Sequence, residues 1–177
     1  MVNLTSLVRI DLSSNDLSGS IPEEIGALPS LETLILDTNR FSGNIPRSLG
    51  TAASLRMVDL QDNSLSGVIP PFQKMPSLRF LDLTANFLSG SIPGSLGNVS
   101  SLNYILLAEN VLEGLIPEAL GHIPNLTNLE LGYNRLSGNV PAVIYNASSL
   151  RYLGLGENML DGQIYLTLAT HSQTSNH

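Results

Sequence analysis

The sequence predicts an α/β-type repeat solenoid, in which seven short coils stack in one direction and share one parallel sheet. Three observations predict it. An asparagine recurs at intervals of 24, 24, 23, 24, 24 and 24 residues. Leucines stand eight and three places before each of these asparagines. A glycine stands four places after each, and six of the seven are followed by an Ile-Pro or Val-Pro pair.

The leucines define a short strand with one buried face. The first column is Leu7, Leu31, Leu55, Leu78, Leu102, Leu126 and Leu150, and the second is Leu12, Leu36, Leu60, Leu83, Leu107, Leu131 and Leu155. A third apolar column lies two places before the second: Ile10, Leu34, Val58, Leu81, Ile105, Leu129 and Leu153. This alternation is typical of a strand. Coils of equal length return the chain in the same direction, so neighbouring strands are expected to be parallel.

The leucine spacing also sets the expected boundaries. Residues 1–6 match the end of a preceding repeat, and seven repeats start at 7, 31, 55, 78, 102, 126 and 150 within residues 7–168. Residues 169–177 carry no column residues, and we expect a disordered tail there. Neither end carries a polar cap, which predicts that the chain is part of a longer protein.

These residues resemble a known family. The segment from Leu126 to Pro141 follows the pattern LxxLxLxxNxLSGxIP of the plant-specific leucine-rich repeat, and the likeness extends from Leu7 to about Ile164. Residues 140–158 are most similar to the ectodomains of immune receptor kinases. The resemblance implies a right-handed superhelix with its parallel sheet on the concave face, an asparagine ladder, and extra strand-like structure around the SGxIP stretch.

Composition excludes several functions. The net charge of -7 provides no footprint for nucleic acid, and the absence of cysteine excludes disulfides and thiolate chemistry. His122, His171 and His177 are scattered, so neither a metal site nor a catalytic triad is expected. The pair Gly154 and Gly156 lacks the third glycine of a dinucleotide site. We therefore expect no enzyme activity and no cofactor. No signal peptide or membrane-spanning run is visible.

The asparagines are expected to be structural. An amide at the end of every strand is best explained by hydrogen bonds to turn backbone. The column consists of Asn15, Asn39, Asn63, Asn86, Asn110, Asn134 and Asn158.

Ligand selectivity has to come from outward positions that differ between coils, which are the third, fifth, seventh and eighth places. Aromatic residues accumulate at these places in the later coils, at Phe80, Tyr104, Tyr133 and Tyr152. Exposed aromatic side chains dominate recognition energetics, which makes them the first ligand-binding candidates. The alternative is ordinary strand propensity for aromatic residues.

The fifth place carries further candidates, Asp59, Asp82 and Glu130. An open ribbed face lacks the cleft that acid–base chemistry needs, so we expect these acids to be solvated and available to a basic ligand.

Four Asn-x-Ser/Thr sequons are glycosylation candidates if the parent protein is secreted: Asn3, Asn98, Asn125 and Asn146. The alternative is that the motif is simply part of the repeat consensus.

The resemblance implies a ligand-binding segment of a plant receptor-like kinase ectodomain, whose kinase domain would lie outside this chain. The expected partners are a peptide or protein ligand and a co-receptor kinase, at the extracellular face of the plasma membrane. Two alternatives stay open: a secreted protein resembling polygalacturonase inhibitors, and a truncated, non-functional fragment.

Overall fold

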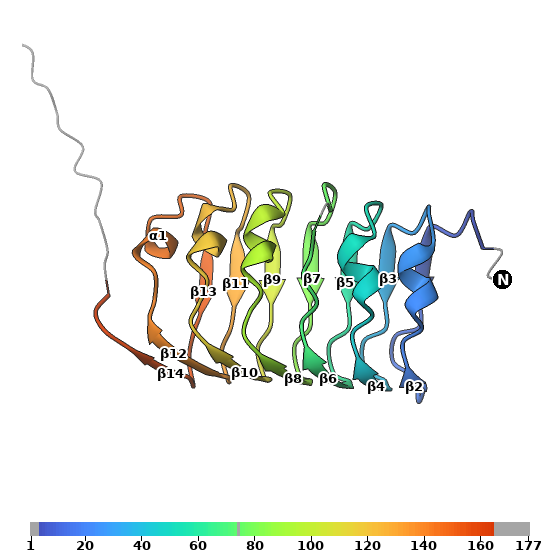
Figure 1. Ribbon diagram of the computed structural model, residues 1–177, viewed down its shortest axis with the longest axis horizontal. Helices are drawn as coiled ribbons and strands as arrows, with labels where there is room; N and C mark the ends of the chain where they lie inside the picture. The colour runs from blue at the N-terminus through green and yellow to red at the C-terminus, as the bar shows by residue number, and fades with distance from the viewer. Residues whose placement is uncertain (1–3, 74, 165–177) are drawn as a thin grey trace, which may run out of the picture.

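The computed structural model describes residues 4–73 and 75–164. The coils lie side by side along one long axis, and the predicted solenoid with a parallel sheet is confirmed (Figure 1). Seven parallel strands, one from each coil, form what we call the concave sheet. In spatial order they are β1 (Arg9–Asp11), β3 (Thr33–Ile35), β5 (Met57–Asp59), β7 (Phe80–Asp82), β9 (Tyr104–Leu106), β11 (Asn128–Glu130) and β13 (Tyr152–Gly154).

The register of the concave sheet matches the repeat period without a slip. Leu34 is the partner of Val58, and Val58 is the partner of Leu81. These side chains are 0–1% exposed, while their neighbours in the same strands are more accessible, except Asp82. The alternation along each strand therefore places one column in the core and the third and fifth places on the outer face.

A second parallel sheet forms where the resemblance implied strand-like structure, after each asparagine. It runs along the lower edge of Figure 1. Its members are β14 (Met159–Asp161), β12 (Arg135–Asn139), β10 (Val111–Gly114), β8 (Phe87–Gly90), β6 (Ser64–Val68), β4 (Arg40–Asn44) and β2 (Ser18–Ser20). The glycine column ends or interrupts these strands with positive φ, from 71° at Gly138 to 90° at Gly162, a region that favours glycine.

Short helices close most of the coils on the side that faces the viewer in Figure 1. They are η1 (Glu23–Ala27), η2 (Arg47–Thr51), η3 (Gly94–Asn98), η4 (Glu118–His122) and α1 (Ala142–Tyr145). The third coil is one residue shorter and carries Pro70 and Pro71, and no helix is assigned in its described residues. Phe72, which is 0% exposed, fills the core there as Leu49 does in the second coil.

The core is one continuous apolar axis. Leu55, Leu78 and Leu102 of the first column are 0% exposed, as are Leu60, Leu83 and Leu107 of the second. Leu12 in the first coil is 42% exposed, because only the second coil packs against it as a complete coil among the described residues. Burial therefore depends on stacking, as in other solenoids.

The asparagine column joins neighbouring coils. The Nδ2 group of Asn86 donates to the carbonyls of Leu83 and Thr84 in its own turn and of Leu60 in the preceding coil. Its Oδ1 accepts from the backbone N–H of Leu65 at 2.9 Å. The same pattern holds from Asn39 to Asn158. Each of these amides satisfies backbone groups on both sides of a coil boundary, and those bonded to Asn86 are largely buried.

Candidate functional site

The aromatic candidates lie in coils four to seven, three of them on strands of the concave sheet and Tyr133 in the turn after β11. Tyr104 is 39% exposed, Tyr152 51% and Tyr133 62%. Tyr104 and Tyr152 both pair with Asn128, so the three residues form one row across β9, β11 and β13. Tyr133 follows β11 at the eighth place of the sixth coil. Large apolar surface thus remains accessible on one face, where a ligand can cover it.

Phe80 differs from the expectation that it is exposed. It is half-buried, because its ring packs against the ring of Tyr104 with centroids 5.5 Å apart and planes inclined by 46°. This geometry is favourable for aromatic pairs. The contact holds the Tyr104 ring in place from one side.

The expectation that the fifth-place acids are solvated is wrong for Asp82 and only partly right for Asp59. Asp82 is 6% exposed and Asp59 is half-buried. The two are register partners on β5 and β7, and Leu106 flanks Asp82 on the other side. An aspartate side chain is short, so larger neighbours shield it.

Burial changes the acidity of this pair. Desolvation raises the pKa of Asp59 to about 6, and the nearby charge of Asp82 adds to the effect. Desolvation also raises the pKa of Asp82, although the backbone N–H of Thr84 donates to its Oδ1 at 2.9 Å. Within the described residues neither acid forms an ion pair, so a cation from outside could neutralise them.

Glu130 is held in a fixed position at the other end of the candidate set. Its Oε1 accepts from the backbone N–H of Gly132 at 3.0 Å. Its carboxylate lies over Gly154, where the Cβ of any other residue would collide with it. Hydrogen bonding to Glu130 raises the pKa of the Tyr152 phenol.

The eighth place has an unusual backbone. All seven residues there have φ between 50° and 54°, among them Tyr133 at 54°. A bulky side chain in the left-handed region is uncommon and is maintained by surrounding structure. The N–H of Tyr133 donates to Gly156 at 2.8 Å, and its carbonyl accepts from Asn110. These bonds fix the backbone from which the Tyr133 ring projects.

The outward places of the concave sheet are acidic. Their one basic residue, Arg9, is paired with Asp11 at 2.7 Å. Carboxylates are distributed along the sheet at Asp11, Asp37, Asp59, Asp62, Asp82, Glu109, Glu130 and Glu157. Long-range electrostatics therefore favour a ligand with positive charge.

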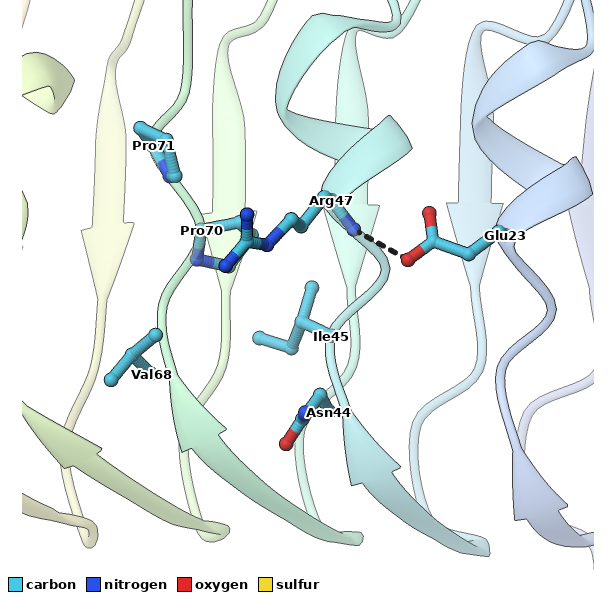
Figure 2. Close-up of a pocket in the computed structure, with 7 residues that line it drawn as sticks. All are labelled: Glu23, Asn44, Ile45, Arg47, Val68, Pro70 and Pro71. Carbon is cyan, nitrogen blue, oxygen red and sulfur yellow. Dashed lines mark hydrogen bonds between the residues drawn. The ribbon is translucent and has the colours of Figure 1, made fainter.

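Two hollows lie outside the aromatic row. The first, of about 340 Å³, opens beside the third coil, where Pro70 and Pro71 stand in place of a helix (Figure 2). Glu23 borders it and accepts from the backbone N–H groups of Arg47 and Ser48, which lowers the pKa of its carboxyl. The second, of about 310 Å³, is lined by Arg79, Ser101, Asn103 and Asn125.

The sequons differ in their surroundings. Asn98 and Asn146 are exposed at the ends of η3 and α1. Asn125 is also exposed, but its Nδ2 donates to the carbonyl of Ser100 at 3.1 Å. Asn3 lies outside the described residues. The return path of each coil, rather than the concave sheet, carries the three described sequons.

The described residues contain no group of three or more His, Cys, Asp or Glu side chains that could hold a metal ion. None of their helices has the length and apolarity needed to cross a bilayer.

Family models assign the chain to a protein family. A leucine-rich-repeat model matches residues 76–136, and a second one matches residues 6–28, 30–52 and 54–74. The chain belongs to the leucine-rich-repeat family. No curated protein sequence matched it.

Similarity to solved structures identifies the kind of leucine-rich-repeat protein. A plant peptide hormone receptor, RGFR1 in complex with RGF2, is 38% identical with a TM-score of 0.87, over 89% of this chain and 26% of that one. The Arabidopsis receptor kinase HAESA, in complex with the peptide hormone IDA and the co-receptor SERK1, has the same identity and TM-score, over 91% and 27%.

A pollen receptor kinase 3 structure is 33% identical with a TM-score of 0.80, over 88% of this chain and 76% of that chain. The fold is therefore that of plant receptor kinase ectodomains and not of a catalytic domain. The chain spans about a quarter of the length of the two hormone receptors.

Proposed function

We propose that the chain is a ligand-binding segment of a plant receptor-like kinase ectodomain and that it docks a peptide on the concave sheet. The observation that carries the proposal is the accessible row of Tyr104 and Tyr152, on β9 and β13 to either side of Asn128 on β11, with Tyr133 beside it. Aromatic residues of this kind supply most of the binding energy at protein interfaces.

Two further facts support a peptide as the ligand. RGFR1 and HAESA, which share this fold, are described as complexes with peptide hormones. The concave sheet is acidic, and its third- and fifth-place side chains repeat from strand to strand. An extended peptide that runs across the strands would meet these side chains one coil at a time.

The parent protein would present this segment at the extracellular face of the plasma membrane. A co-receptor kinase would complete the complex, as SERK1 does in the HAESA structure. The similarity of residues 140–158 to immune receptor ectodomains favours a defence or pathogen-derived peptide. Glycans at Asn98 and Asn146 would leave the concave sheet free, because both residues lie on the return path.

The experiment begins with peptides selected on the folded chain from a displayed random library. Their affinities are then measured by calorimetry for the wild type, Tyr104→Ala and Tyr152→Ala. Phe87→Ala is the matched control, because Phe87 is 61% exposed but lies on β8 of the second sheet.

We expect each tyrosine variant to weaken binding about tenfold or more, equivalent to about 1.4 kcal/mol. Phe87→Ala should leave the affinity unchanged, and circular dichroism should show that all three variants melt like the wild type. Loss of binding in Phe87→Ala alone would contradict the proposal.

A further inference from the structure

Glycines replace side chains at three outward places of the last two coils. The fifth place of the seventh coil is Gly154, and the seventh place is Gly132 in the sixth coil and Gly156 in the seventh. Earlier coils carry Asp59 and Gln61 at the same two places. A glycine in or beside a strand often marks a position where another group approaches the backbone closely. We call the area formed by Glu130, Gly132, Tyr152, Gly154 and Gly156 the glycine notch.

The Glu130 carboxylate occupies the floor of the glycine notch. It extends over Gly154. A Cβ added at this position would collide with Oε2 and with the carboxyl carbon. Its Oε1 accepts from the N–H of Gly132 at 3.0 Å, so one oxygen is anchored to the backbone. A Cβ at Gly156 would meet no atom within 4 Å, which leaves this side of the notch open to solvent.

The carboxylate is not neutralised by the protein. Ion pairs in the described residues join Arg9 to Asp11, Arg40 to Asp16 and Arg56 to Glu32. None of them involves the last three coils. The outward places of these coils hold Glu109, Glu130 and Glu157 but neither lysine nor arginine. The notch is therefore a fixed, half-buried negative charge in an acidic surrounding, with a tyrosine ring at its edge.

We propose that the glycine notch binds an arginine side chain of the docked peptide, an inference that rests on the proposed function. A guanidinium is planar and can lie flat over the open backbone at Gly156, where it would donate to the Glu130 carboxylate. The Tyr152 ring beside it adds a cation–π contact. The compact ammonium of lysine would gain the charge interaction but not the stacking.

The neighbouring acids are less suited to this role. Asp82 is 6% exposed, whereas Glu130 is half-buried. Asp59 lies beside Asp82 in register. No glycine replaces a side chain at the fifth or seventh place of these two coils, whereas Gly156 beside Glu130 faces open space.

The test uses two capped tripeptides, acetyl-Gly-Arg-Gly-amide and its citrulline counterpart, which has nearly the same shape without the charge. Binding is followed through the backbone amide signals of Gly132, Gly154 and Gly156 in two-dimensional NMR titrations. The Gly132 amide reports directly, because it donates to Glu130. The variants are Glu130→Gln and Gly154→Ala, and Glu113→Gln on β10 of the second sheet is the matched control.

We expect the arginine peptide to bind at least about fivefold more tightly than the citrulline peptide, given the strength of charge-assisted and cation–π contacts. Glu130→Gln should remove this preference, whereas Glu113→Gln should retain it. Gly154→Ala keeps the charge but displaces the carboxylate, so it should weaken binding by a similar factor. A loss in Glu130→Gln that Gly154→Ala does not reproduce would indicate general electrostatics and overturn the proposal.

The two proposals fail in different ways. Equal affinity for arginine and citrulline peptides, while library-selected peptides still depend on Tyr104 and Tyr152, would overturn the arginine site alone. Library-selected peptides that shift no amide of the concave sheet would overturn the proposed function itself.

Discussion

Replacing Asn86 by alanine tests how the coils are joined. The substitution removes the acceptor of the buried Leu65 N–H, which lies 2.9 Å from Oδ1. It also removes donors to Leu60, Leu83 and Thr84. The first two carbonyls keep the amides of Asn63 and Asn110, at 3.2 and 3.0 Å, and the third keeps the backbone N–H of Asp62 at 2.9 Å. One buried N–H therefore loses its partner, and we expect a loss of about 2–3 kcal/mol in the free energy of unfolding.

Asn15→Ala is the matched control. Among the described residues the Asn15 side chain donates to Leu12 and Ser13 of its own turn alone, and both bonds are exposed. This variant should cost about 0.5 kcal/mol or less, as is usual for surface changes. Urea unfolding followed by circular dichroism gives both values, and hydrogen exchange at Leu65 locates the effect. Equal losses in the two variants, or unchanged exchange at Leu65, would refute the role of the amide in joining coils.

Four other substitutions probe the apolar axis, the coil spacing and the half-buried Asp59. Leu107→Ala, at a residue 0% exposed, should cost about 2–5 kcal/mol, and a smaller loss would argue against one tightly packed axis. Gly121→Ala would place its Cβ 2.9 Å from the backbone N of Ile144 and should cost about 1–3 kcal/mol, whereas Gly94→Ala meets no atom within 4 Å and should be tolerated. Equal effects of the two glycine variants would contradict this account of coil spacing. Asp59→Asn should stabilise the protein above pH 6 and lose this advantage as the pH falls to 4. The reason is that a raised folded-state pKa makes the ionised carboxyl unfavourable in the folded protein only at the higher pH. Thermal melts of variant and wild type between pH 4 and 7 measure the difference, and a constant difference would contradict the assignment.

The repeat spacing was sufficient to predict most of the fold. Coils of 23 or 24 residues with inward leucines at fixed places predict parallel strands stacked in register. Leu34, Val58 and Leu81 align in this way. The positions of the outward columns followed from the same alternation. This was possible because the alternation of inward and outward side chains is a local property of each strand, and similar coils repeat it along the chain.

The candidate site was predictable in its location but not in its details. The burial of Asp82 and the half-burial of Phe80 depend on the side chains of adjacent coils, which are separated in sequence by a whole repeat. The sequence alone did not predict a structural role for Gly154 and Gly156. The structure shows that Gly154 makes room for Glu130.

The backbone at the eighth place was also missed. Residues as different as Ala85, Glu109 and Tyr133 all adopt positive φ there. Glycine or asparagine would have signalled this conformation, but neither occurs in the column. The conformation is instead imposed by backbone hydrogen bonds to the following coil, such as that from Tyr133 to Gly156.

The most direct test of a concave docking surface is to map a library-selected peptide on the isotope-labelled chain by amide chemical shifts. We predict that the shifted amides cluster on β9, β11 and β13 and in the turns that follow them, around Tyr104, Tyr133 and Tyr152. A cluster on the second sheet, around Phe87 and Leu115, would contradict the account.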